Sequence, residues 1–216
     1  MDAIRDEIKK LREDFTKGTL SEADVKANPF EQFEIWLAQA VEAKITEVQA
    51  TTLSTITSDN KPSSRIVYMR EFENNNFFIY SNYNSQKAIH ISKNNNVTLN
   101  FFWPELERQL RVEGTITKCD AKRSDNYFNS RPEESKLSAW ASSQSSELKS
   151  RKELEDLVES FRKKFEGKEI PRPDFWGGYV ITANYYEFWQ GRKSRLHDRI
   201  CYKKENEGWK IFRLAP

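Results

Sequence analysis

The amino-acid sequence predicts a mainly β protein with α-helical additions, arranged as an antiparallel barrel. Short β-branched or alternating segments are separated by tight turns that contain Asn, Asp and Pro. Only a few segments carry apolar residues at helical spacing. The chain shows no linker, internal repeat or low-complexity segment, and we therefore expect a single domain over residues 1–216.

The first half of the chain opens with a charged, weakly helical segment at residues 1–20, a candidate mobile N-terminal segment. Asn28, Pro29 and Glu31 then match a helix start, because Asn caps a helix and Pro suits its first position. Apolar residues at helical spacing continue this helix to Val41. The strands expected next are residues 51–57, 65–70 and 77–80, with turns at 58–62 and 73–76.

The second half of the chain alternates strands with helices. Ser85 is the expected N-cap of a short helix that ends near Ser92. A longer helix at residues 147–165 carries apolar residues on one face, and Pro171 and Pro173 are expected to stop it. The other expected elements are strands at residues 97–103, 110–116, 179–187, 197–203 and 209–213, and short helices at 120–129 and 133–142.

Composition narrows the class of protein. The sequence has 35 basic and 33 acidic residues, and this near balance argues against a general nucleic-acid binder. No apolar run approaches the ~18 residues of a membrane span. Cys119 and Cys201 have no metal or redox spacing, and the start of the chain is not signal-like. We therefore expect a reduced, cytoplasmic protein.

Several chemistries lack their sequence patterns. The only two histidines are His90 and His197, so we expect no His-rich metal centre and no metal. The glycines form neither a G-x-G-x-x-G dinucleotide fingerprint nor a P-loop. The G-x-S-x-G elbow of the α/β-hydrolases is also absent.

Two segments carry side chains suited to phosphate. Ser85, Gln86 and Lys87 combine a hydroxyl, a cation and a helix N-terminus, and Arg65 supplies a second cation. An exposed helix start with a Lys is, however, common on protein surfaces.

Tyr127, Arg131 and Ser135 form the second such segment, because they recur every four residues. Two hydroxyls and a guanidinium make a cradle for a phosphate monoester. Pro132 is expected to break the helix after Arg131, and the alternative is a capped helix end with solvated polar groups.

The C-terminal region concentrates Arg192, Arg195 and Arg199 beside Trp189 and His197. Arg recognises phosphate and carboxylate through paired hydrogen bonds, and Trp offers a flat face to a ring system. Arg195 and His197 alternate, so a strand would place them on one face. The flanking arginines are expected to lower the pKa of His197 and favour neutral imidazole. The alternative is an amphipathic strand with a solvated charged face.

Short motifs follow one another along nearly the whole chain. They are Arg65-Ile-Val, Tyr80-Ser-Asn, Ser85-Gln-Lys, Glu107-Arg-Gln, Tyr127-Phe-Asn-Ser-Arg-Pro, Ala139-Trp-Ala-Ser-Ser-Gln-Ser-Ser, Phe175-Trp-Gly-Gly, Glu187-Phe-Trp-Gln-Gly, Arg195-Leu-His-Asp-Arg and Arg213-Leu-Ala-Pro. Each is unspecific alone, but together and in this order they resemble the pyridoxine/pyridoxamine 5'-phosphate oxidase family.

The resemblance implies an FMN-binding split β-barrel and a homodimer with FMN sites at the subunit interface. It also implies FMN-dependent oxidation of pyridoxamine 5'-phosphate and pyridoxine 5'-phosphate to pyridoxal 5'-phosphate. Dioxygen would accept the electrons and yield hydrogen peroxide, with ammonia released from the amine substrate.

The resemblance assigns site residues by position. The implied FMN contacts are Arg65, Ile66, Val67, Tyr68, Met69, Arg70, Tyr80, Ser81, Gln86, Lys87, Gln109, Gln144, Ser145, Trp189 and Arg199. The implied substrate contacts are Arg70, Tyr127, Arg131, Ser135, Arg195, Leu196 and His197. Of these, Arg195 and His197 are the implied catalytic pair, which would lie against the pyridine ring.

Some positions depart from the family pattern. The family commonly has Arg at the position of Gln86 and Lys at that of Arg70, and Ser81 replaces a usual Thr. Arg12-Glu-Asp-Phe15 matches a segment that can cover the site, but Phe15 lacks the hydroxyl of the usual Tyr, which weakens a lid function.

Two other functions stay open. A flavin reductase-like split-barrel enzyme would not need the phosphate cradle together with Arg195 and His197. A non-catalytic carrier of FMN or pyridoxal phosphate would bind its ligand without producing peroxide.

Overall fold

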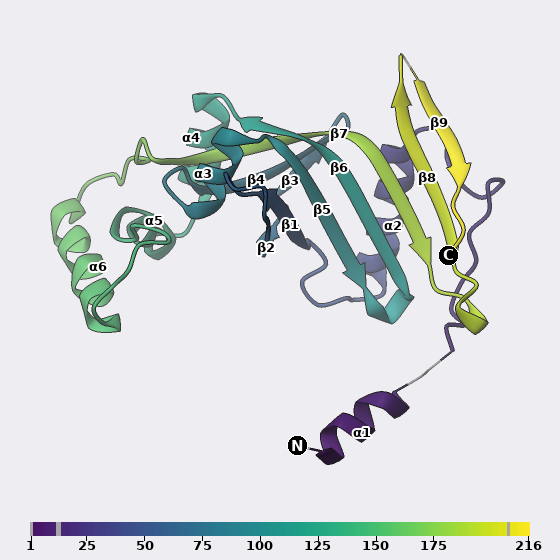
Figure 1. The fold of residues 1–216 in the computed structure, drawn as a ribbon. Helices are drawn as coiled ribbons and strands as arrows, with labels where there is room; N and C mark the ends of the chain where they lie inside the picture. Colours follow the sequence, from purple (N-terminus) through teal and green to yellow (C-terminus); the bar gives the residue numbers. More distant parts are fainter. Residues whose placement is uncertain (1, 12–13, 207) are drawn as a thin grey trace. The chain divides into compact units, whose positions relative to one another are not determined.

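The computed structural model describes residues 2–11, 14–206 and 208–216 (Figure 1). The chain divides into two compact units. Unit 1 comprises Met1–Val48, Asn100–Val112 and Asn184–Pro216, and unit 2 comprises Gln49–Leu99 and Glu113–Ala183. The expectation of a single domain over residues 1–216 stays a prediction.

Unit 2 is built on antiparallel strands in the order β2-β1-β5-β6-β7-β4-β3. β1 and β2 form a hairpin in which Ala50 pairs with Tyr68, and Tyr80 pairs with Gly178 between β4 and β7. The elements of this unit are β1 (Ala50–Ile56), β2 (Pro62–Tyr68), β3 (Glu71–Glu73), β4 (Asn76–Asn82), α3 (Gln86–Lys93), α4 (Ala121–Ser130), α5 (Glu133–Ala141) and α6 (Arg151–Phe165). Three strands contribute residues to both units: β5 (Asn96–Trp103), β6 (Arg108–Lys118) and β7 (Trp176–Gln190).

The helices of unit 2 enclose a core of their own. Phe128 of α4, Leu137 of α5 and Trp176 of β7 are buried together. The apolar face of α6 packs against this cluster through Phe161 and Phe165, which confirms the amphipathic helix expected there. Burial on this side leaves polar side chains at the end of α4 and at the α4–α5 junction partly exposed.

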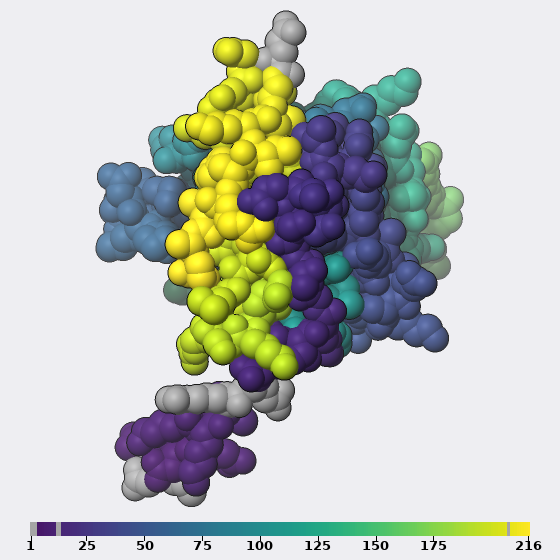
Figure 2. Space-filling model, turned by 90° about the vertical axis from the view of Figure 1, so that its right-hand side faces the viewer, coloured from purple at the N-terminus to yellow at the C-terminus, as the bar shows by residue number. Residues whose placement is uncertain are grey.

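Unit 1 combines a helix with the C-terminal strands. Its elements are α1 (Asp2–Lys10), α2 (Pro29–Glu42), the 3₁₀ turns η1 (Pro104–Leu106) and η2 (Lys193–Arg195), β8 (Asp198–Glu205) and β9 (Gly208–Arg213). The Asn28 side chain accepts a hydrogen bond from the Phe30 N–H at 2.9 Å, so α2 begins as predicted. Trp36 of α2 meets the ring of Phe188 of β7 edge-on, with centroids 5.0 Å apart. The segment just before α2, dark purple in Figure 2, lies against the yellow β8 and β9, to which Leu20 and Glu22 are hydrogen-bonded.

The described elements confirm the mainly β prediction, with some differences. β2 begins earlier and ends earlier than expected, because the Met69 N–H bonds to Gln49 while the next N–H, of Arg70, bonds to Phe78 of β4. The three-residue strand β3 was not predicted, since so short a segment shows no alternation.

The start of α6 also differs from the prediction, whereas its end agrees. The helix starts at Arg151, where the Ser150 side chain accepts a hydrogen bond from the Glu153 N–H. It ends at Phe165 as predicted, ahead of the two prolines that were expected to stop it. The chain instead turns at Gly167, whose φ of 68° favours glycine.

Within the described ranges, no helix is both long and apolar enough to cross a membrane. The same ranges contain no cluster of three or more His, Cys, Asp or Glu side chains placed to hold a metal ion.

The close packing of β6 against β7 at Gly114 can be tested by substitution. A Cβ on Gly114 would overlap the Thr182 carbonyl oxygen of β7. We expect Gly114→Ala to lower the free energy of unfolding by about 1–3 kcal/mol, because the backbone must shift to admit the methyl group. Urea denaturation measures this, with Gly208→Ala as control, since the nearest atom to its Cβ lies 4.0 Å away. Equal stability of the two variants would contradict the close packing of these strands.

Candidate active site

A cavity of about 470 Å³ opens in unit 2. Its walls come from β2, β4, α3, the α4–α5 junction, the segment after α5 and the start of β7. Most of the predicted contacts of this unit line it: Ile66, Val67, Tyr68, Arg70, Tyr80, Ser81, Lys87, Tyr127, Arg131, Ser135 and Gln144. Folding therefore brings together residues predicted for the cofactor and residues predicted for the substrate.

Four lining residues were not selected from the sequence: Asn82, Ser130, Pro132 and Trp176. Asn82 and Trp176 lie within family-like motifs, and Ser130 and Pro132 flank Arg131. In the sequence, only these positions next to selected residues could have indicated that the four residues line the cavity.

The other predicted residues of unit 2 lie outside the lining set. The Met69 side chain is buried, and Arg65 lies on β2. The Gln86 N–H donates to the Ser145 hydroxyl at 3.2 Å, which holds the segment after α5 at the start of α3. Ser145 itself has a φ of 77°, a backbone conformation that non-glycine residues rarely adopt.

Lys87 carries a cation into this cavity. Its Nζ donates to the Ser81 hydroxyl at 3.0 Å, the Ser85 hydroxyl at 3.2 Å and the Gln144 Oε1 at 3.4 Å. All three acceptors are neutral. Burial, and then the charge of Arg65, lower the pKa of Lys87. Ser85 occupies the N-cap position of α3 as predicted, but its hydroxyl donates to the Asn82 carbonyl and does not cap the helix.

Arg65 is fixed by neutral oxygens of the β1–β2 hairpin. Its guanidinium donates to the Thr55 hydroxyl at 2.7 Å, the Leu53 carbonyl at 3.1 Å and the Ser63 hydroxyl at 2.6 Å. The Thr55 hydroxyl also lies 3.1 Å from Nδ1 of the buried His90. Burial lowers the pKa of Arg65. Within the described residues, neither Arg65 nor Lys87 forms an ion pair with a carboxylate, so the charge of both side chains is suited to an anion.

Arg131 provides a third cation, which is half-buried like Arg65 and Lys87. It follows α4 with extended backbone angles, so the helix breaks there as Pro132 predicted. Its guanidinium lies 4.5 Å from the centroid of the Trp176 ring, and burial lowers its pKa. Its Nη1 is buried and has no hydrogen-bond partner among the described residues. An unpaired buried donor is costly, and here it faces a cavity that can admit an acceptor.

An aromatic stack supports Arg131. The rings of Tyr80 and Tyr127 are stacked with centroids 3.6 Å apart, and Trp176 extends the stack at 5.9 Å from Tyr80. The Tyr80 hydroxyl donates to Glu71, which also pairs with Arg123. Burial and this contact raise the pKa of Tyr80, so it stays a neutral phenol.

A second group of predicted residues lies in unit 1. A cavity of about 890 Å³ there is lined by Leu11, Asp14, Phe15, Arg192, Ser194, Arg195 and His197. The predicted strand face shared by Arg195 and His197 is wrong, because β8 begins only at Asp198. Ser194 and Arg195 have φ values of 55° and 61° and turn the chain within the loop between β7 and β8. Leu196 is exposed, and Gln109 is half-buried on β6.

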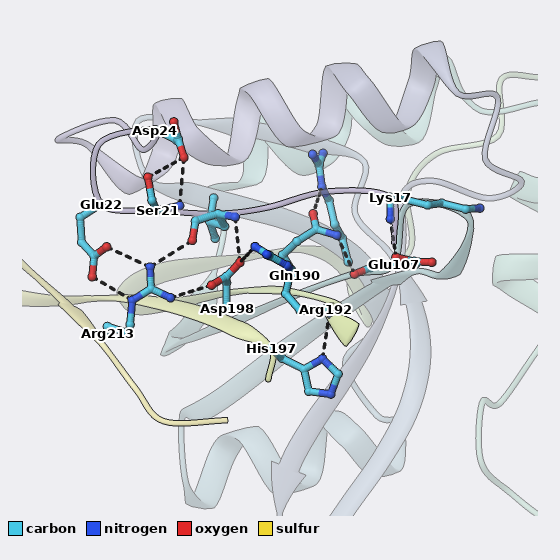
Figure 3. Close-up of polar contacts among 12 residues, drawn as sticks. Lys17, Ser21, Glu22, Asp24, Glu107, Gln190, Arg192, His197, Asp198 and Arg213 are labelled. Atoms are coloured by element: carbon cyan, nitrogen blue, oxygen red, sulfur yellow. Dashed lines mark hydrogen bonds and ion pairs between the residues drawn. The ribbon is translucent and has the colours of Figure 1, made fainter. Parts of the chain in front are cut away.

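His197 is held as a neutral hydrogen-bond donor. Its Nδ1 accepts a hydrogen bond from the backbone N–H of Arg192 at 3.1 Å (Figure 3). Since Nδ1 accepts, the proton of the neutral ring is on Nε2. Burial, and then the charge of Arg195, lower the pKa of His197, while Asp198 acts in the opposite direction.

Phe15 packs against this imidazole. Its ring centroid lies 5.4 Å from that of His197 and 5.7 Å from that of Trp189, both edge-on. A Cβ on Gly191 would come within 2.7 Å of the Phe15 ring, so glycine admits the ring. Of the segment matched as a lid, Arg12 and Glu13 lie outside the described residues.

Arg199 is paired within the chain. Its Nε donates to Glu187 at 2.8 Å and its Nη1 to the Ala215 carbonyl at 2.8 Å, while Arg111 donates to the same carboxylate at 2.6 Å. Burial acts to raise the pKa of Glu187, but the hydrogen bonds from the two arginines outweigh it and lower the pKa. Glu187 belongs to a family-like motif, but its pairing with two arginines was not predicted. Arg111 was not selected from the sequence.

Two family comparisons cover most of the chain. Residues 37–165 match the family described as "Pyridoxamine 5'-phosphate oxidase", and residues 176–216 match "Pyridoxine 5'-phosphate oxidase C-terminal dimerisation region". The chain belongs to the pyridoxine/pyridoxamine 5'-phosphate oxidase family. It is an oxidoreductase, and family membership supports a flavin cofactor.

Relatives with this family name match over nearly their full length. The chain is 46% identical to the pyridoxine/pyridoxamine 5'-phosphate oxidase of Cytophaga hutchinsonii over 215 residues, which is 99% of this chain and 100% of the relative. It is 45% identical to that of Leptospira biflexa, over 97% of this chain and 99% of the relative.

Solved structures confirm the fold. PhzG of Burkholderia lata, crystallised with tetrahydrophenazine-1-carboxylic acid, superposes with a TM-score of 0.85 at 26% identity, over 92% of this chain and 98% of that chain. An FMN-binding protein of Nostoc punctiforme related to pyridoxamine 5'-phosphate oxidase gives a TM-score of 0.68 at 14% identity, over 89% and 100% of the two chains. The split-barrel prediction is therefore confirmed.

The oxidase should hold His197 with a lowered pKa that depends on Arg195. We expect His197 to titrate below the ordinary value of ~6.5, and we expect Arg195→Leu to raise its pKa because a nearby positive charge is removed. NMR titration of the imidazole measures both. Lys193→Leu, which removes another cation of the same loop, is the control and should have the smaller effect. A fall in the pKa of His197 in Arg195→Leu would refute this account of the loop.

Proposed function

We propose that this oxidase converts pyridoxamine 5'-phosphate and pyridoxine 5'-phosphate to pyridoxal 5'-phosphate, with FMN as cofactor and dioxygen as electron acceptor. The products would include hydrogen peroxide and, from the amine, ammonia. The observation that carries the proposal is half-buried positive charge without matching carboxylates among the described residues, at Arg65 and Lys87 and again at Arg131. Two such sets suit two phosphate groups, one on the cofactor and one on the substrate.

The residues present fit FMN. Lys87, Arg65 and the N-terminus of α3 supply cationic and N–H groups for its phosphate, and Gln144 and Ser81 supply polar groups beside Lys87. By family position, Gln109, Trp189 and Arg199 complete the cofactor contacts. When bound, FMN supplies the two-electron oxidant that takes hydride from the C4' carbon of the substrate.

The chain's own groups would bind and orient the substrate. Arg131 would donate its unpaired N–H to the substrate phosphate, together with the hydroxyls of Tyr127 and Ser135 and the charge of Arg70. Arg195 would hold a positive charge by the pyridine ring, and His197 would donate from Nε2. These groups position the substrate, and positioning alone can lower a reaction barrier substantially.

The described C-terminal dimerisation region supports a homodimer. We infer that the FMN sites form at the interface of its subunits, as the family resemblance implies.

The phosphate cradle favours this activity over that of the PhzG-like neighbour. The ligand of that structure is named as a carboxylic acid, whereas a guanidinium between two hydroxyls suits a phosphate monoester. The test is to add pyridoxamine 5'-phosphate to the purified protein in air and assay peroxide, ammonia and pyridoxal 5'-phosphate. Unphosphorylated pyridoxamine is the control substrate. Ligand binding without peroxide would identify a carrier.

The cofactor has a direct test of its own. We expect mass spectrometry of the released cofactor to find FMN and not FAD. Lys87→Met should weaken FMN binding by roughly tenfold to a hundredfold, because a charge-assisted contact to phosphate contributes about 1.5–3 kcal/mol. Lys93→Met, at the other end of α3, should bind FMN normally. A colourless protein that FMN does not reconstitute would rule out the proposed cofactor.

A substitution of Arg131 tests which of the two proposed phosphate sites binds the substrate and which binds the cofactor. We expect Arg131→Ala to raise KM by roughly tenfold to a hundredfold where KM follows binding, with FMN affinity unchanged. Steady-state kinetics of the flavin-replete variant measure this, and Arg151→Ala on the exposed start of α6 is the control. An unchanged KM accompanied by loss of flavin would show that the two phosphate sites are assigned the wrong way round.

A further inference from the structure

The loop that carries Arg195 and His197 needs an anchor. β7 and β8 stay paired as far as Gln190 and Asp198, so residues 191–197 cross between the strands without sheet pairing. Two successive residues in this loop, Ser194 and Arg195, have positive φ. Such conformations are strained for non-glycine residues and persist where surrounding contacts enforce them.

Asp198 supplies contacts at the base of this loop (Figure 3). One carboxylate oxygen accepts hydrogen bonds from the Leu20 N–H at 3.0 Å and from Arg192 Nη1 at 2.8 Å. The other accepts from Arg213 Nη1 at 2.8 Å. The side chain is 15% exposed. Burial acts to raise its pKa, but these three donors lower it, so the carboxylate stays ionised.

Arg192 spans the loop because it is held at two points. Its guanidinium binds Asp198, and its backbone N–H donates to Nδ1 of His197 at 3.1 Å. The bond from the Arg192 side chain to Asp198 thus holds Arg192 in place, and the backbone N–H of Arg192 in turn holds the imidazole of His197. A ring whose Nδ1 accepts must carry its proton on Nε2 when neutral. The carboxylate therefore acts on His197 through Arg192.

We propose that Asp198 is a positioning residue that, by anchoring Arg192, holds the imidazole of His197 in one orientation with its proton on Nε2. The use of that Nε2–H toward the substrate rests on the function proposed above. The orientation and the tautomer do not, and they can be measured without substrate.

The remaining contacts of the cluster offer a matched control. Arg213 also donates to both carboxylate oxygens of Glu22, at 3.0 and 2.9 Å, and to the Leu20 carbonyl. These bonds attach the chain before α2 to Asp198, but none of them reaches Arg192. Glu22→Gln therefore weakens this attachment and leaves the pairing of Asp198 with Arg192 in place.

NMR on the full-length protein tests the proposal, and the presence of only two histidines makes the imidazole signals assignable. In Asp198→Asn we expect the Arg192 amide to exchange with solvent roughly two- to tenfold faster, the factor for one lost hydrogen bond. We also expect the His197 nitrogen shifts to move toward a mixture of tautomers. Arg192→Gln should give the same changes while Asp198 keeps its bonds to Leu20 and Arg213, so it serves if Asp198→Asn does not fold.

Activity provides the second readout. Flavin-replete Arg192→Gln and Asp198→Asn should lose roughly tenfold to a hundredfold in kcat/KM, as expected for a misplaced catalytic group. Arg192→Lys should recover part of it. Unchanged Arg192 exchange and His197 shifts in both variants would overturn the proposal, as would equal changes in Glu22→Gln. If the wild-type protein lacks the oxidase activity, the proposed function fails while the NMR comparison still decides the position of His197.

Discussion

Unbalanced positive charge is the constraint on which the unit 2 cavity depends. Within the described residues, Lys87 and Arg65 bond to neutral oxygens, and Arg131 keeps a buried N–H unpaired. Taking a cation out of water is unfavourable unless an opposite charge accompanies it. The folded unit therefore retains an electrostatic cost that a bound anion would relieve. Anion binding would then also stabilise this unit against unfolding.

The arginines of unit 1 serve a different purpose. Arg111 and Arg199 pair with the buried Glu187, and Arg192 and Arg213 pair with Asp198. In the sequence alone, the density of Arg near the C-terminus indicated capacity for ligands. In the structure much of that density balances the carboxylates of the buried Glu187 and the half-buried Asp198, and so orders the backbone around His197. Arg195 differs from these arginines because its side chain is exposed and lines the unit 1 cavity.

The fold was largely predictable because its elements follow local patterns. Helix α2 has its cap and apolar face in consecutive residues, and the alternating segments became β5 and β6. Errors arose where distant residues decide the outcome. The strand expected at residues 197–203 is present as β8, but the face expected to be shared by Arg195 and His197 is absent because pairing with β7 ends at Asp198.

The candidate site also has features that local sequence predicts and features that only folding determines. The positions of Tyr127, Arg131 and Ser135 along one cavity were predictable from spacing and family motifs. The support of Arg131 by Trp176 and the support of Arg192 by Asp198 were not, since only folding places these partners together.

The stack of Tyr80, Tyr127 and Trp176 has a consequence for how this sequence can evolve. The three rings come from β4, α4 and β7, and the Arg131 guanidinium rests on the Trp176 face. Replacing Trp176 with a small residue would remove both a neighbour of two tyrosines and the surface beneath the Arg131 guanidinium. Mutations at these positions are therefore not independent, and drift at one restricts which changes the others can accept.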